Sequence, residues 1–146
     1  MRERFWERFP LDQLSRQEWE ALCDGCGRCC LVKLQDEDTD ELHFTSLSCR
    51  FLDTERCRCT VYEERSQREP DCVRITPALV ATMPGLPSTC AYAVLARGEA
   101  LPPWHPLLTG DRDSVRRAGI SVAGQVLSQV LVDEDDYEDY VVRWVD

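Results

Sequence analysis

CDGCGRCC, residues 23–30, places four of the chain's nine cysteines within eight residues. The sulfurs belong to Cys23, Cys26, Cys29 and Cys30. A C-x2-C turn brings two thiolates to one metal ion with little strain, and a pair further along the chain can complete the site. Because the glycines in the stretch allow sharp turns, several sulfurs can face one point. The stretch predicts that metal ligation organises the fold around it.

The residues before this stretch predict a helix over 11–22. Apolar residues recur on one face of that segment, and Ser15 with Glu18 has the spacing of a capping box. Such a helix delivers Cys23 at its C-terminal end.

The adjacent pair Cys29–Cys30 distinguishes this run from a simple metal loop. Three cysteines spaced C-x2-C-x2-C have the pattern with which bacterial ferredoxins hold three corners of an iron–sulfur cluster, but there the fourth cysteine follows after a spacer. Side chains of consecutive residues point in different directions. We therefore expect one of the pair to ligate with Cys23 or Cys26, while the other joins the later cysteines or packs as a small apolar residue.

Five further cysteines follow at Cys49, Cys57, Cys59, Cys72 and Cys90. Residues 45–75 show no sustained period, so an irregular segment tied down by ligation is expected there. Nine sulfurs allow two four-cysteine sites with one spare, or one cluster with several structural cysteines. Zinc and an iron–sulfur cluster both suit thiolate ligands, and both stay open.

The rest of the chain predicts a single domain over 1–146 of the α+β class, with mainly short helices, irregular cysteine-rich loops and one or two short strands. Helices are expected after Thr76 and from Ser88 or Thr89 to Gly98. Short strands are expected within 119–132 and an acidic helix over 133–145. LPPWHPLLTG, residues 101–110, has too many prolines for a helix and is expected to form a strap across the core.

The net charge of −10 limits the partners. Eleven of the 27 acidic residues lie in 36–41 and 133–140. Binding to nucleic acid or to an anionic membrane is disfavoured, because both need a basic face. The expected partner is a metal ion or cluster, and the acidic surface suits a basic protein partner.

The compartment expected for the chain is the cytoplasm. No apolar run approaches the roughly 18 residues of a membrane span, and the charged N-terminus has no apolar segment of a secretory signal. Thiols stay reduced in the cytoplasm, which favours metal or redox use of the cysteines over disulfides.

Four blocks carry a resemblance to a known family: CDGCGRCC, CRFL at 49–52, CTVYEERS at 59–66 and PDC at 70–72. Together they resemble the bacterial CxxCxxCC family, described as zinc- or iron-chelating. The segments 19–45 and 101–110 resemble its YcgN-like branch. The resemblance implies these metal ligands: Cys23, Cys26, Cys29, Cys30, Cys49, Cys59 and Cys72.

Other residues match the family pattern only in part. Cys57 and Cys90 fit the YcgN-like pattern alone, and Tyr62 and Arg65 lie inside the third block. The wider family has Arg-Pro where this chain has Arg65 and Ser66, so a different turn is expected before Cys72.

The function predicted from the sequence is therefore a cytoplasmic metal-binding protein that holds iron, as an iron–sulfur cluster, or zinc. One alternative is a thiol redox protein in which Cys23 and Cys26 cycle. Another is an adaptor with structural zinc and an acidic interaction face. No catalytic motif is present.

For some residues near the cysteines, two roles are open. Tyr62 is expected either to donate a hydrogen bond to a ligated sulfur or to pack in the core. His43 is expected at the surface, and His105 as a hydrogen-bonded structural residue. The neighbouring arginines either offset thiolate charge or lie at the surface: Arg28, Arg50, Arg58 and Arg65.

Overall fold

The computed structural model describes residues 1–146, which divide into two compact units, each taken by itself below. Unit 1 comprises Met1–Asp24 and Arg74–Ile120, and unit 2 comprises Gly25–Val73 and Ser121–Asp146. The first boundary therefore falls inside the cysteine motif, so Cys23 belongs to unit 1. No helix of the chain is long and apolar enough to cross a membrane.

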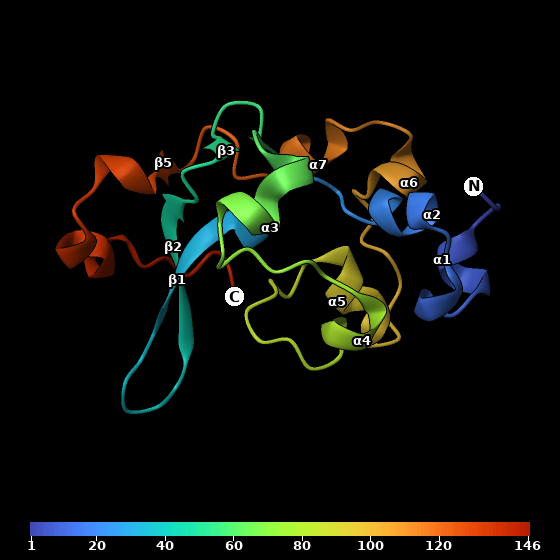
Figure 1. Ribbon diagram of the computed structural model, residues 1–146. Helices are drawn as coiled ribbons and strands as arrows, with labels where there is room; N and C mark the ends of the chain where they lie inside the picture. The colour runs from blue at the N-terminus through green and yellow to red at the C-terminus, as the bar shows by residue number, and fades with distance from the viewer. The chain divides into compact units, whose positions relative to one another are not determined.

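Unit 1 is built from short helices (Figure 1). They are α1 (Phe5–Arg8), η1 (Leu11–Gln13), α2 (Arg16–Ala21), α4 (Pro77–Val80), α5 (Ala91–Ala96), α6 (Pro106–Thr109) and α7 (Ser114–Arg117), where η marks a 3₁₀ helix. Their shared core consists of Phe5, Leu22, Val80 and Tyr92, with a ring of partly buried apolar side chains around them. Helices this short are marginal alone, so their stability comes from packing on this core.

The helix predicted over 11–22 is split in two. Leu14 is extended, with φ −74° and ψ 145°, and it separates η1 from α2. The predicted capping box is confirmed, because Ser15 accepts a hydrogen bond from the Glu18 N–H and the Glu18 carboxylate accepts one from the Ser15 N–H. The cap therefore fixes where α2 begins.

Three other helix starts, those of α4, α5 and α6, bear on the sequence predictions. Thr76 caps α4, with Pro77 at its first position, as predicted. The helix α5 begins later than predicted, after Cys90. The expectation of no helix in 101–110 was wrong for its last turn, because Pro106 takes the first position of α6, where proline costs no hydrogen bond.

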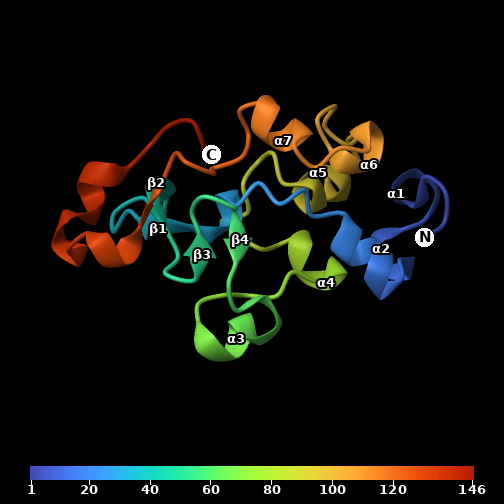
Figure 2. The same cartoon turned by 90° about the horizontal axis from the view of Figure 1, so that it is seen from above.

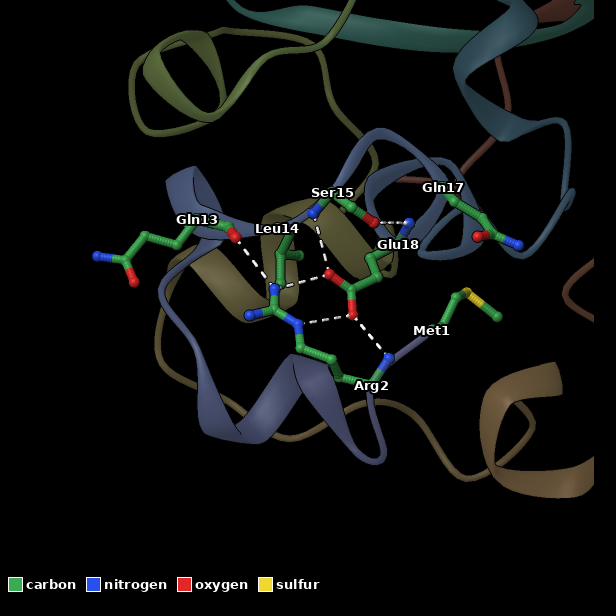
Figure 3. Close-up of a pocket in the computed structure, with 7 residues that line it drawn as sticks. All are labelled: Met1, Arg2, Gln13, Leu14, Ser15, Gln17 and Glu18. Atoms are coloured by element: carbon green, nitrogen blue, oxygen red, sulfur yellow. Dashed lines mark hydrogen bonds and ion pairs between the residues drawn. The ribbon is translucent and has the colours of Figure 1, made fainter.

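The carboxylate of Glu18 also binds the N-terminal segment, as Figure 3 shows. It accepts hydrogen bonds from the Arg2 backbone N–H at 3.0 Å, from Arg2 Nε at 3.2 Å and from Arg2 Nη2 at 2.8 Å. Glu18 is 1% exposed. The hydrogen bonds from the Arg2 side chain, followed by the one from Ser15, lower the pKa of Glu18 from 4.5 to about 2.

This shift predicts a pH-dependent effect of Glu18→Gln. Because the pKa is lower in the folded than in the unfolded chain, the stabilisation by Glu18 is complete above about pH 4.5 and fades as the pH falls toward 2. Thermal unfolding of both proteins at several pH values should show a gap that is widest at neutral pH and narrows in acid. A gap that stays constant down to pH 3 would contradict this role.

Ser15→Ala, which removes only a neutral cap, should lower the free energy of unfolding by about 0.5–2 kcal/mol.

Unit 2 contains the strands. A three-stranded sheet has the order β1 (Leu31–Gln35), β2 (Leu42–Ser48) and β5 (Leu127–Ser128). The first pair is antiparallel and the second parallel. A separate antiparallel pair joins β3 (Leu52–Asp53) to β4 (Arg58–Cys59), visible in Figure 2. The short helices of the unit are η2 (Arg28–Cys30), η3 (Tyr62–Glu64), α3 (Arg65–Arg68), η4 (Gln129–Leu131) and η5 (Glu134–Tyr140).

The α+β class is confirmed, and the β1–β2 hairpin adds to the strands that the sequence predicted. Its loop is the acidic run 36–41, where the Asp36 carboxylate accepts hydrogen bonds from the N–H groups of Asp38 and Thr39. These acids thus close a turn between two strands. The predicted strand within 119–132 is β5, and the predicted C-terminal helix is the 3₁₀ helix η5.

The core of unit 2 lies under the hairpin and includes a cysteine. Its buried members are Leu31, Phe44, Leu52, Cys57, Val122, Val126 and Val145. Gly27, with φ +78°, packs directly on this core, where a Cβ atom would overlap the Cys57 sulfur and lie 2.8 Å from Cγ2 of Val122. The motif glycine thus serves close packing as well as the turn.

Candidate metal centre

The segment 49–52 is the point to which the other cysteine-bearing segments of unit 2 attach. The backbone N–H of Cys49 donates to the carbonyl of Cys30 at 2.7 Å. Leu52, in β3, pairs with Cys59 in β4. Backbone pairing therefore holds Cys30 and Cys59 close to the turn that carries Cys49.

The Cys72 segment attaches to the same turn through side chains. Arg50 Nη2 lies 3.3 Å from Oε2 of Glu69 and donates to the carbonyl of Arg68 at 3.3 Å. The Cys72 N–H in turn donates to the carbonyl of Glu69 at 3.0 Å. The residue after Cys49 thus holds the turn that leads to Cys72.

The thiols on these segments are close enough to affect one another electrostatically. Burial raises the pKa of Cys49, and the charges of Cys59 and Cys72 raise it further. Burial likewise raises the pKa of Cys72, with added contributions from Cys59 and Cys29. We call the set the thiol cluster: Cys29, Cys30, Cys49, Cys59 and Cys72.

The thiols of Cys29 and Cys30, which adjacency predicted to have separate roles, interact with each other. Their thiols form a hydrogen bond, which is the first cause of a pKa of Cys29 well above its usual value, followed by desolvation of the sulfur. The pair lies at the end of η2, whose tight 3₁₀ turn leads directly into β1. As residues, Cys29 is exposed and Cys30 is partly buried.

Charged residues of both signs surround the thiol cluster. Arg65 lowers the pKa of Cys72, and Glu69 raises the pKa values of Cys72 and Cys49. Arg65 thus acts on a thiol as the charge-offset hypothesis predicted. The sequence analysis did not single out Glu69, because only the folded chain brings it beside two cysteines.

For Tyr62 and for Arg28, the structure excludes one of the two predicted alternatives. Tyr62 is 42% exposed, so it is not a core residue, and the Arg65 guanidinium lies 4.0 Å from the centre of its ring. Arg28 is buried at 6% exposure, with its guanidinium 5.7 Å from the Trp144 ring centre, so it is not a surface arginine.

The other cysteines occupy three different settings. Cys26 is buried in unit 2, and its sulfur accepts the Arg28 N–H at 3.5 Å. Cys57 belongs to the apolar core of unit 2. In unit 1, Cys23 is exposed after α2, and Cys90 packs against the apolar core at the start of α5.

No disulfide joins any of the nine cysteines. No group of three or more histidine, cysteine, aspartate or glutamate side chains is arranged to hold a metal ion as the side chains stand. The structure thus gathers the segments of the thiol cluster, and the rotamers of its sulfurs do not form a finished coordination sphere.

The histidines lie outside the thiol cluster. His43 is exposed on β2, as predicted. His105 is fully buried in unit 1 and uses both ring nitrogens in hydrogen bonds, one to Leu22 and one to Leu107. Its predicted structural role is confirmed.

Comparison with known proteins agrees with the chemistry of these cysteines. Residues 22–91 match the CxxCxxCC family model, described as "Putative zinc- or iron-chelating domain". This span includes all nine cysteines, since it begins before Cys23 and ends after Cys90. No solved structure matches the chain.

Similarity to whole proteins extends over nearly the full length. A UPF0260 protein of Granulibacter bethesdensis is 53% identical over 140 residues, covering 96% of this chain and 83% of that protein. A UPF0260 protein of Cellvibrio japonicus is 52% identical over 141 residues, covering 97% and 96%. One from Marinobacter nauticus is 49% identical over 141 residues, covering 97% and 95%. The chain therefore belongs to the UPF0260 family, and its residues 22–91 are similar to the CxxCxxCC domain.

Proposed function

We propose that this protein binds zinc or iron, the latter as an iron–sulfur cluster, through cysteine thiolates. The observation that carries the proposal is the convergence of cysteines from four chain segments on the turn at 49–52. A segment rich in short irregular elements gains little from apolar burial, and metal ligation supplies folding free energy directly. The cytoplasm, where thiols remain reduced, is the compartment that suits such a site.

The proposed ligands are those of the sequence analysis: Cys23, Cys26, Cys29, Cys30, Cys49, Cys59 and Cys72. The thiol cluster forms the centre of the set. Cys23 and Cys26 join it on the strength of their C-x2-C spacing. Cys57 and Cys90 are left out, because each packs in an apolar core.

The donor atoms fit the proposed metals. Soft thiolate ligands favour zinc and iron–sulfur clusters over magnesium or calcium, which prefer oxygen. Cysteine has a single side-chain torsion leading to its sulfur, so rotation about it redirects each thiol while the backbone stays in place. The hydrogen bonds that join the segments can therefore persist when a metal binds.

The electrostatics of the thiol cluster also favour a cation. Burial raises the pKa values of Cys49 and Cys72, and the proximity of the other thiols raises them further, because neighbouring thiolates would repel one another. A bound cation reverses the sign of that interaction and stabilises the deprotonated sulfurs. The closeness that disfavours thiolates in the metal-free chain thus becomes favourable once a metal is bound.

The test is the metal content of the protein purified without oxygen. We expect at least about one equivalent of zinc or iron by elemental analysis, because structural thiolate sites bind tightly. Iron accompanied by acid-labile sulfide and visible absorption would assign an iron–sulfur cluster, and zinc without colour would assign a zinc site. Less than about half an equivalent of either metal, also after addition of zinc or reconstitution with iron and sulfide, would refute the proposal.

A further inference from the structure

Two adjacent side chains of the proline-rich segment 101–110 bind the residues on both sides of Cys23. Trp104 Nε1 donates a hydrogen bond to Oδ2 of Asp24 at 3.3 Å. His105 Nε2 lies 2.7 Å from the carbonyl oxygen of Leu22, which can only accept. We call Trp104 and His105 the clasp. All of these residues belong to unit 1.

The hydrogen bonds of His105 fix which nitrogen carries the proton. The Leu107 N–H donates to Nδ1 at 3.0 Å, so Nδ1 is an acceptor and Nε2 carries the hydrogen that reaches Leu22. His105 is fully buried. The donor toward the Leu22 carbonyl is therefore held in a single direction.

The clasp is itself anchored. Ser114 Oγ donates to the Trp104 carbonyl at 2.5 Å and lies 2.9 Å from Oγ1 of Thr109. On the other side, the Tyr92 hydroxyl donates to the carbonyl of Trp19 in α2 at 2.7 Å. The end of α2 is thus bound by both α5 and the clasp.

Cys23 combines a fixed backbone with an exposed side chain. The residue before it, Leu22, is fully buried, whereas Cys23 itself is exposed. The hydrogen bonds of the Leu22 carbonyl and of the Cys23 N–H, which donates to Glu20, restrict the backbone here, and the bond to the Asp24 side chain holds the residue that follows. Restricting a ligand residue before the metal binds reduces the entropic cost of metal binding.

We infer that Trp104 and His105 are positioning residues for Cys23, which present its thiolate for metal ligation. This inference rests on the proposed function, in which Cys23 is a ligand. Segment 101–110 thus contributes to metal affinity in addition to covering the core of unit 1.

Matched variants separate this role from a general effect on folding. Asp24→Ala removes the acceptor for Trp104, while Asp24→Asn keeps a carbonyl oxygen there. His105→Asn keeps an acceptor for the Leu107 N–H but loses the donor to Leu22. His105→Gln does the reverse, because its amide nitrogen occupies the position of Nε2.

The measurement is zinc affinity, from competition with a chromophoric chelator, together with the melting temperature. Asp24→Ala and His105→Asn should each weaken zinc binding about fivefold or more, the amount expected for one lost hydrogen bond. Asp24→Asn and His105→Gln should stay within about twofold of the unchanged protein. In a Cys23→Ser background, Asp24→Ala should have no further effect on zinc affinity.

The outcomes distinguish the two proposals. Unchanged zinc affinity in Asp24→Ala and His105→Asn, with or without a lower melting temperature, would overturn the positioning role while leaving the metal site intact. If Asp24→Ala lowered zinc affinity equally in the Cys23→Ser background, the positioning role would also be overturned, because the effect would not act through Cys23. Absence of zinc binding by the unchanged protein, together with failure of reconstitution with iron and sulfide, would refute the proposed function itself, and the clasp inference would fall with it.

Discussion

Replacing Cys59 by serine is expected to weaken zinc binding by more than about a hundredfold. Structural zinc sites supply roughly 10–16 kcal/mol, so each of four ligands contributes about 3 kcal/mol. Serine keeps the size of the side chain but offers no soft thiolate donor at neutral pH. Cys59 lies in β4 and pairs with Leu52, so the backbone pairing should survive the change.

Cys90→Ser is the matched control for this prediction. Cys90 lies in unit 1 at the N-cap of α5, where serine is a favourable capping residue. Its zinc affinity should equal that of the unchanged protein. Equal affinities for Cys59→Ser and Cys90→Ser, measured by chelator competition, would remove Cys59 from the ligand set.

Gly27→Ala is expected to destabilise unit 2 by about 2–5 kcal/mol. The left-handed backbone at φ +78° costs roughly 1–2 kcal/mol for any residue with a Cβ, and overpacking a core adds about 1–3 kcal/mol. The added methyl group would overlap the Cys57 sulfur and approach Val122, and both neighbours are buried in the core. Denaturant unfolding measures the loss.

Gly25→Ala isolates the packing part of this effect. Gly25 has a similar φ of +75°, but nothing lies within 4 Å of the position its Cβ would occupy. Its cost should stay near the 1–2 kcal/mol of the backbone term alone. Adding Cys57→Ala to Gly27→Ala should make the Gly27 substitution less costly than it is in the unchanged protein. Equal costs at Gly25 and Gly27 would show that Gly27 serves the turn alone.

Local chemistry made the helix starts of unit 1 predictable. Ser15 with Glu18 and Thr76 with Pro77 each carry their signal within four residues, and the structure places caps at both positions. The same reasoning failed at Leu14, where the apolar period continues through a residue that is extended. Periodicity does not report such a break, because the apolar side chain stays on the core in either conformation.

The β1–β2 hairpin was hidden by its acidic loop. Residues 36–41 are exposed, and within them Asp36 accepts the hydrogen bonds that close the turn. The strand at 42–48 alternates imperfectly, because both Phe44 and Thr45 are buried. A strand buried on both faces lacks the period that identifies it.

The candidate site, like the fold, could be predicted from the sequence only in part. The sequence alone identified the cysteines, since residue type and spacing carry that signal. The proximity of Cys49 to Cys72 depends on Arg50 and Glu69, which are 19 positions apart in the chain. Likewise, the hydrogen bond between the Cys29 and Cys30 thiols depends on the 3₁₀ turn η2, which spacing does not predict.

The central claim is that the thiol cluster holds the metal, and alkylation of the cysteines with and without metal tests it most directly. The protein is labelled with iodoacetamide before and after removal of metal by a chelator, and each modified cysteine is identified by mass spectrometry. We predict that metal protects the thiol cluster, Cys29, Cys30, Cys49, Cys59 and Cys72, and that chelation exposes these cysteines to labelling. Cys90 should label equally in both states. Labelling of these five cysteines that is identical with and without bound metal would contradict the account.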